Sequence, residues 1–357
     1  MRKSGWRPEG ASHRQKSMNK IRVLIVDDSS FVRKALLRIF DAEPGIEVVG
    51  VASTGKEAIE KVLGLGPDVI TLDINMPGMD GIETLKVIME ERPTPVLMLS
   101  QFTKQGADLT LRALELGAMD FVDKSSTGMM DFLELAREII AKVTTIAGSR
   151  PVAKGAHCVR ALPCLNIKGL VDVVAVGAST GGPMALQTLL SAFPEDVPFA
   201  LLVVQHMPSG FTGPLARRLD TFCAIRVKEA EEGDQVVPGL CLIAPAGLHM
   251  TVRKGREFTR ARLAADPPGE VHKPSVDVLF ASVAKNFGDR AIGVLLTGMG
   301  SDGAKGMYGI KKSGGYTIAQ DEATSAIFGM PRVAVEQGGV DKVMPLGLIA
   351  AEILARA

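Results

Sequence analysis

The stretch Val173–Leu186 reads VVAVGASTGGPMAL, and the interpretation of the second half of the chain depends on the turn that it contains. A run rich in valine leads into the Gly-rich segment Gly177–Gly182, and a helix-compatible segment follows. This pattern predicts a buried strand that turns sharply into the N-terminus of a helix. Such a turn can present Ser179 as a nucleophile above a sheet, but it can equally hold a phosphate on its backbone N–H groups.

Apolar runs on the C-terminal side of this turn predict further strands of a parallel sheet. FALLVVQHM, RAIGVLLTG and YTIAQ read as strands, with helical segments between most of them. IRVKEA, GLCLIAP and HMTVRKGREFTRARL alternate apolar and polar residues, so we expect them to be antiparallel strands added to the parallel core. Residues 170–357 are therefore predicted to form a doubly wound α/β domain with added antiparallel strands.

The first half of the chain shows the same alternation on a smaller scale. IRVLIVDD, IEVVGVA, DVITLDI, PVLMLS and AMDFVDK predict five strands, each followed by a helical pattern. Residues 20–146 should therefore form a second doubly wound α/β domain, with a five-stranded parallel sheet. Residues 147–169 contain Gly, Pro and basic residues without a sustained period, which favours an interdomain linker, and the polar residues 1–19 are expected to be a disordered extension.

Composition and charge exclude several classes of partner. The formal net charge is +1 over 357 residues, and no basic segment indicates a nucleic-acid partner. The longest apolar runs are far shorter than the roughly 20 residues of a membrane span, so no direct membrane insertion is expected. The four cysteines form no CxxC pair, which favours reduced thiols and a cytoplasmic location.

Acidic and polar residues follow the predicted strands of the first domain. Asp27 and Asp28 end the first strand and Asp73 the third, while Ser100 and Lys124 end the fourth and fifth. A lone aspartate after a strand is commonly a helix N-cap, but five polar or charged residues at four strand ends favour a site at one edge of the sheet. Three carboxylates together suit Mg²⁺, and a hydroxyl and an ammonium beside them can hold a phosphoryl group.

The motifs VLIVDDS, LDINMPGMDG, LMLS and GAMDFVDK stand in the order found in the receiver domain of two-component response regulators, which this half of the chain resembles. The resemblance implies that Asp73 accepts a phosphoryl group from a sensor histidine kinase. It implies that Mg²⁺ is bound by three carboxylates, those of Asp27, Asp28 and Asp73. It further implies that the change is relayed through three residues, Ser100, Phe121 and Lys124.

If Ser179 is a nucleophile, it needs a base and an orienting acid at neighbouring strand ends. His206 directly follows the run FALLVVQ and is the best placed base, while His249 and His272 are reserve candidates with structural or substrate-contacting roles. Asp302 follows another strand in the turn TGMGSDG and can supply the acid, although it could also be a simple helix cap.

The chain order of these residues is Ser, His, Asp. GASTG matches the G-x-S-x-G nucleophile elbow, but α/β-hydrolases place their acid before their histidine, so this motif alone would mislead. Backbone N–H groups near Met299 and at Thr180, together with the N-terminus of the following helix, are expected to stabilise an oxyanion. No cofactor is expected at this second site.

The motifs GASTGGP, VVQHMP, IAPAGLHM, HKPSVDVLF, LLTGMGSDGAKGM and GMPRVAVE resemble, in order and spacing, the catalytic domain of chemotaxis protein-glutamate methylesterases. The resemblance implies a triad of Ser179, His206 and Asp302. It implies that the substrate is a glutamate γ-methyl ester on a methyl-accepting chemoreceptor, that methanol is released and that some receptor glutamines are deamidated. It also implies that the receiver covers the active site until Asp73 is phosphorylated.

Two other interpretations of the second half deserve comparison. A nucleotide-binding or scaffolding output domain would use GASTGG as a phosphate cradle, but the P-loop lysine is missing and no acidic residue closes the next strand. A receptor-docking protein with an inactive triad would keep the fold, but Ser179, His206 and Asp302 are all present. Labelling of Ser179 by a serine-directed phosphonate distinguishes both alternatives from an esterase, because labelling requires an activated hydroxyl.

Overall fold

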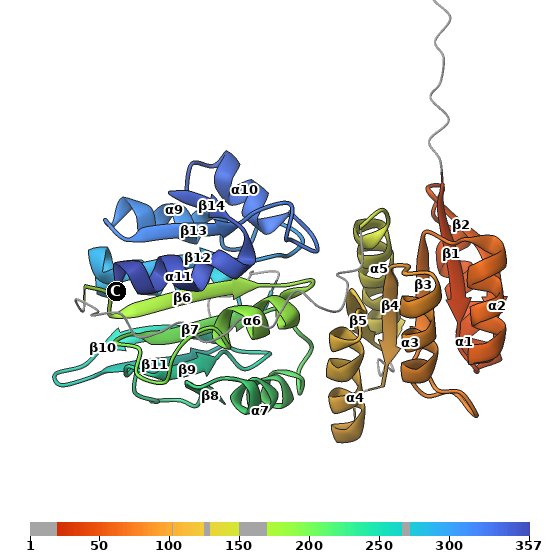
Figure 1. Ribbon diagram of the computed structural model, residues 1–357, viewed down its shortest axis with the longest axis horizontal. Coiled ribbons are helices and arrows are strands. Elements are labelled where there is room, and N and C mark those ends of the chain that lie inside the picture. The colour runs from red at the N-terminus through yellow and green to blue at the C-terminus, as the bar shows by residue number, and fades with distance from the viewer. Residues whose placement is uncertain (1–19, 102, 125–128, 150–169, 266–271) are drawn as a thin grey trace, which may run out of the picture.

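The computed structural model describes residues 20–101, 103–124, 129–149, 170–265 and 272–357. The predicted N-terminal extension and residues 150–169 of the predicted linker lie outside these described residues. The described chain forms two α/β units that lie side by side, each with its own sheet (Figure 1).

The first unit is a doubly wound domain, as predicted. Its sheet has the strand order β2-β1-β3-β4-β5, and all neighbouring pairs are parallel. Its strands are β1 (Ile21–Val26), β2 (Ile46–Ala52), β3 (Val69–Asp73), β4 (Val96–Ser100) and β5 (Asp120–Asp123). Its helices are α1 (Ser30–Asp41), α2 (Gly55–Leu65), α3 (Gly81–Glu91), α4 (Lys104–Glu115) and α5 (Met129–Ile146). Four of these helices begin after a polar residue whose side chain accepts a backbone N–H, which fixes where each strand-to-helix turn ends: Ser29, Thr54, Asp80 and Thr103.

The second unit has a seven-stranded parallel sheet with the order β14-β13-β12-β6-β7-β9-β8. Its strands are β6 (Val173–Ala178), β7 (Ala200–Gln205), β8 (Arg226–Glu229), β9 (Leu240–Ile243), β12 (Ala291–Leu295), β13 (Tyr316–Gln320) and β14 (Lys342–Met344). Its helices are α6 (Gly182–Leu190), α7 (Thr212–Phe222), α8 (Val276–Phe287), α9 (Ala304–Lys312), α10 (Met330–Glu336) and α11 (Leu346–Arg356), with a short 3₁₀ turn at Gly288–Arg290. Over the described ranges, no helix combines the length and apolar character that a bilayer crossing requires.

One part of the predicted topology is wrong. The IRVKEA and GLCLIAP segments form β8 and β9, which extend the main sheet as parallel strands, with β8 at the edge, and not as antiparallel additions. Only β10 (His249–Lys254) and β11 (Thr259–Ala264) form an antiparallel pair, as expected. The segment between β8 and β9 crosses over this hairpin, where Val236 N–H donates to the Thr259 carbonyl at 2.9 Å. Side chains alternate between the two faces of a strand whatever the direction of its neighbour, so the apolar pattern could not distinguish the two arrangements.

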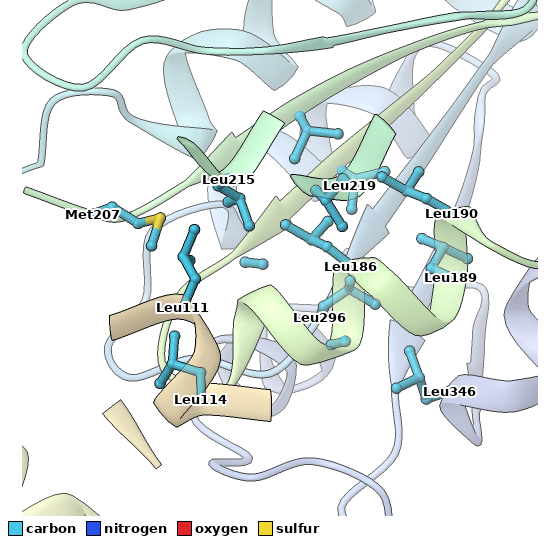
Figure 2. Packing of buried hydrophobic residues seen from close by; sticks show 14 of the residues in the cluster. Leu111, Leu114, Leu186, Leu189, Leu190, Met207, Leu215, Leu219, Leu296 and Leu346 are labelled. Carbon is cyan, nitrogen blue, oxygen red and sulfur yellow. The ribbon is translucent and has the colours of Figure 1, made fainter. Parts of the chain in front are cut away.

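The two units share a buried apolar contact. Helix α4 of the first unit packs on α6 and α7 of the second, and buried residues from both units belong to one continuous cluster. Figure 2 shows Leu111 and Leu114 of α4 facing Leu186 of α6 and Leu215 of α7, with Met207 beside them. This contact holds the α4–β5–α5 side of the first unit against the end of the second sheet at which Ser179 lies.

Candidate active site

Ser179 lies in a turn whose backbone is tightly held. Strand β6 ends at Ala178, Ser179 N–H donates to the Thr297 carbonyl at 3.0 Å, and Gly182 N–H donates to the Ser179 carbonyl at 2.7 Å. Gly181 begins the helix in the left-handed region with a φ of 74°, and a Cβ added there would lie 2.5 Å from that of Ala326. Only glycine fits this position, and the turn therefore aims the N-terminus of α6 at the site.

His206 and Asp302 are hydrogen-bonded, as the predicted triad requires. His206 directly follows β7, and its Nε2 lies 2.8 Å from Asp302 Oδ2. Its Nδ1 is buried and has no hydrogen-bond partner among the described residues. Because a carboxylate accepts only, Nε2 carries the hydrogen and Nδ1 presents a lone pair. Nδ1 is thus the nitrogen available to take a proton.

Asp302 is bound by the N-terminus of α8. Ser275 Oγ and Asp277 N–H donate to Oδ1 at 3.0 and 2.9 Å, and Val276 N–H donates to Oδ2 at 2.8 Å. Burial raises the pKa of this carboxyl group, but the hydrogen bonds from His206 and from these N–H groups outweigh it and hold the pKa at about 2. The carboxyl group of Asp302 is therefore ionised at neutral pH.

Several of the predicted site residues line one cavity of about 560 Å³. Ser179, Thr180, His206 and Met299 all line it. Gly298 packs so closely on the serine that an added Cβ would lie 2.7 Å from Ser179 Cβ, and this approach brings the Met299 backbone beside the nucleophile. Neither Thr180 N–H nor Met299 N–H donates to a protein acceptor within the described chain, so both are available to an oxyanion.

The other wall of the cavity belongs to the first unit. It is lined by residues of β5 and α5: Asp120, Arg137, Glu138, Ala141 and Lys142. Thr180 Oγ1 donates to Asp120 Oδ2 at 2.6 Å, and Thr145 Oγ1 lies 3.0 Å from Met299 Sδ. Both contacts engage residues that flank Ser179 or its expected oxyanion site. Access to the cavity therefore depends on how the two units are placed.

Two further contacts bridge the units beside the cavity. Arg218 of α7 forms a bidentate ion pair with Glu115 at the end of α4. The rings of Phe121 and Phe211 lie with their centroids 4.6 Å apart. Phe121, which the receiver resemblance singles out as a relay residue, is 2% exposed and is buried between the two units.

The predicted carboxylates of the first unit also converge. Asp27, Asp28 and Asp73 each offer an oxygen, and these oxygens lie within 4.8 Å of one another. Lys124 Nζ lies 3.0 Å from Asp27 and 2.8 Å from Asp73. Burial raises the pKa of Asp73 above its usual value, although Lys124 opposes this shift. Three carboxylate oxygens fit the hard-oxygen preference of Mg²⁺, so the donor set matches the ion expected there.

Ser100 is linked to α4. Its hydroxyl lies 2.8 Å from Thr110 Oγ1, which in turn donates to the Gly106 carbonyl at 2.7 Å. Both hydroxyl groups are buried. A change at Ser100 would therefore reach the helix that packs on the second unit.

His249 and His272, the two reserve candidates for the base, lie in different environments. His249 is fully buried, and its Nδ1 accepts the Ser275 N–H at 3.2 Å, so it supports the segment that holds Asp302 and does not line the cavity. His272 does line the cavity, beside His206.

Sequence reasoning missed two groups that organise the site. Gln205 is buried and donates through Nε2 to the carbonyls of Ser179 and His206 at 2.9 and 3.0 Å, which ties the two turns together. Its position immediately before His206, at a strand end, was the available signal. Ser275 caps α8 as well as binding Asp302, and the motif HKPSVD contains the polar residue before a helix that indicates such a cap.

Comparisons with known proteins agree with this geometry. Residues 174–353 match the model of the CheB methylesterase family, and residues 23–134 match the response regulator receiver domain. A protein-glutamate methylesterase/protein-glutamine glutaminase of Archaeoglobus fulgidus is 47% identical over 94% of this chain and 97% of its own length. A relative of the same description from Geobacter sulfurreducens, numbered 1, is 44% identical over 95% of this chain and 98% of its own. The crystal structure of the Thermotoga maritima CheB methylesterase catalytic domain, 37% identical, covers 52% of this chain and 99% of that one with a TM-score of 0.51.

Proposed function

Since this chain belongs to the family of protein-glutamate methylesterases/protein-glutamine glutaminases with a receiver domain, we propose that Ser179, His206 and Asp302 carry out its reaction through an acyl-enzyme. The substrate is a glutamate γ-methyl ester on a methyl-accepting chemoreceptor. The observation that carries this proposal is the pairing of His206 Nε2 with Asp302, which leaves Nδ1 without a partner among the described residues, while His206 and Ser179 line the same cavity.

The first half-reaction forms the acyl-enzyme. Ser179 Oγ attacks the ester carbonyl while His206 Nδ1 takes its proton, and the negative charge that develops on the carbonyl oxygen is stabilised by the N–H groups of Met299 and Thr180. The C–O bond to the methoxy group then breaks, and His206 returns the proton so that methanol leaves. Asp302 stays ionised throughout and stabilises the imidazolium that forms in between.

The second half-reaction releases the product. Water gives one proton to His206 Nδ1 and attacks the acyl carbonyl, and the bond to Ser179 Oγ breaks as the serine regains its proton. The product is a free glutamate carboxylate. A glutamine enters the same sequence with ammonia as the leaving group, so one acyl-enzyme accounts for both activities in the relatives' name.

We further propose that phosphorylation of Asp73 by a sensor histidine kinase in the cytoplasm controls access to this site. Asp27, Asp28 and Asp73 would hold Mg²⁺, which supplies charge neutralisation for phosphoryl transfer. Lys124 would pair with the phosphoryl oxygens, and Ser100 and Phe121 would pass the change to α4 and to Phe211. Support comes from the receiver residues that line the cavity and from the hydrogen bond between Asp120 and Thr180.

The test is methanol release from a methylated receptor fragment in the presence of Mg²⁺ and a small-molecule phosphodonor. Ser179→Ala should lower turnover by on the order of a million-fold, because a triad serine and its base act as one unit. Phosphorylation of Asp73 should be unchanged in this variant, which controls for folding. Retention of a tenth of wild-type methanol release would contradict the serine mechanism.

A further inference from the structure

The ring of His272 stacks on the ring of His206. Their centroids lie 4.2 Å apart and their planes differ by 21°. His272 comes from the turn before α8, whereas His206 follows β7, so the contact joins two separate segments of the catalytic unit. The His206 side chain is 8% exposed.

This contact supplies a restraint that the triad itself lacks. The hydrogen bond from Nε2 to Asp302 fixes one atom of the His206 ring, but the ring can still rotate about that bond. Nδ1 would then swing away from the nucleophile. A flat ring packed against the imidazole face blocks this rotation and fixes the direction of the Nδ1 lone pair.

The charge of His272 matters as much as its shape. When His206 takes the proton of Ser179 it becomes an imidazolium, which a neutral aromatic face stabilises and a second cation at this separation would repel. Burial lowers the pKa of His272, and the neighbouring His206 lowers it further, while Asp302 acts in the opposite direction. These effects together favour the uncharged form of the stacked ring.

We propose that His272 is a positioning residue of the esterase, whose uncharged ring holds the plane of His206 and lies against the imidazolium formed during acyl transfer. This inference rests on the proposed Ser179 mechanism. The alternative is a direct contact between His272 and the substrate, because His272 lines the cavity. Other charged groups line the same cavity: Lys273 from the catalytic unit, and Asp120, Arg137, Glu138 and Lys142 from the receiver. Asp302 reaches the site through its hydrogen bond to His206.

Three substitutions in the full-length protein, activated with Mg²⁺ and a phosphodonor, separate shape from charge. His272→Phe keeps a flat neutral ring and should retain kcat within about threefold. His272→Ala removes the restraint and should lower kcat by about a hundred-fold with little change in KM. His272→Lys places a fixed cation beside the base, so kcat should fall at least as far as in His272→Ala. In that variant the acid limb of kcat/KM should also move to lower pH, because the cation disfavours protonation of His206.

Lys285→Ala is the control, since Lys285 is exposed on α8, the helix that follows His272, and does not line the cavity. It should leave kcat and the acid limb unchanged. Labelling of Ser179 by a serine-directed phosphonate, a substrate-independent readout, should slow in His272→Ala and not in His272→Phe. Thermal unfolding of the full-length protein reports whether the catalytic unit of each variant is folded, because Asp73 lies in the other unit.

Two results would overturn the inference. A high KM in His272→Phe with a normal labelling rate would show that His272 binds substrate, and an unchanged kcat in His272→Ala would show that the stack is dispensable. Failure of the serine mechanism has a different signature. In that case Ser179→Ala remains active, whatever the behaviour of the His272 variants.

Discussion

Two buried aspartates, each at the carboxyl end of a parallel sheet, are held in opposite ways. Asp73 closes β3, and its burial with Asp27 raises its pKa even though Lys124 pairs with it. Asp302 follows β12, and hydrogen bonds from His206 and from the start of α8 hold its pKa at about 2. The same location in the same class of fold therefore holds two carboxylates in different electrostatic states, which suits the two kinds of chemistry proposed for them.

The difference follows from what surrounds each carboxylate. Asp73 lies beside two other acidic residues, so a bound cation would stabilise its ionised form. The proposed reaction joins one of its carboxylate oxygens covalently to a phosphoryl group. Asp302 accepts hydrogen bonds from His206, Ser275 Oγ and two backbone N–H groups, which suits the proposed role of an ionised group that orients the base. In the proposed mechanism, the carboxylate that reacts has few hydrogen-bond donors around it, and the carboxylate that orients the base has several.

Among the predictions that compare the two aspartates, the largest loss of activity is expected when Asp302 is substituted. Asp302→Asn should lower esterase turnover by about 10⁴-fold, because the amide cannot stabilise the imidazolium of His206. Methanol release from a methylated receptor fragment measures this loss. Phosphorylation of Asp73 should proceed at the wild-type rate, and a coupled loss of both would mean that the fold and not the triad had been damaged.

Removal of the receiver tests the link between the two sites. A cover that leaves the cavity open in about 1% of molecules would allow about a hundred-fold rise in activity when residues 1–165 are deleted. Asp73→Asn in the full chain should keep the low basal rate and abolish activation by Mg²⁺ and phosphodonor. Equal rates for the fragment and for the full chain before and after phosphorylation would end the occlusion proposal.

A smaller effect is expected at the ion pair between the units. Arg218→Ala removes the bidentate contact with Glu115, a partly buried pair worth about 1 kcal/mol, so basal methanol release should rise about fivefold. Arg217→Ala is the matched control, because Arg217 is an exposed neighbour on the same helix. The same rise in both variants would remove this ion pair from the regulatory contact.

The proximity of the candidate site residues could be predicted from the sequence because these residues stand at strand ends. Parallel topology brings strand ends to one edge, so Ser179, His206 and Asp302 could be placed together before any contact was known. The direction of β8 and β9 could not be predicted, because the periodicity of a strand is the same in parallel and antiparallel pairs. Long-range contacts such as Thr180 with Asp120 were equally out of reach, since nothing local in the sequence encodes how two domains dock.

The hydrogen bonds to Asp302 and the ring stacked on His206 could be predicted only in part. Ser275 could have been identified as a helix cap, but its second bond to Asp302 depends on how α8 meets the turn after β12. His272 was identified as a candidate near the substrate, and its ring contact became visible only in three dimensions. Local signals thus predicted which residues would face the site, and packing determined what each of them touches.

The smallest expected effect is on stability, and it has opposite signs at the two aspartates. The pKa of Asp73 is raised in the folded chain, so its ionised form costs stability above the unfolded pKa, and this cost disappears as the pH falls and the group is protonated. Asp73→Asn should therefore raise the melting temperature of the receiver by a few degrees at pH 7 without Mg²⁺, and the gain should vanish near pH 3.

The pKa of Asp302 is lowered to about 2, so the contribution of this carboxylate to stability is present above about pH 4 and is lost as the pH falls towards 2. Asp302→Asn should accordingly destabilise the catalytic unit at pH 7 and have less effect at pH 2. Thermal unfolding of both variants across this range measures the contrast, and a destabilising Asp73→Asn at pH 7 would mean that Lys124 already satisfies the carboxylate in full.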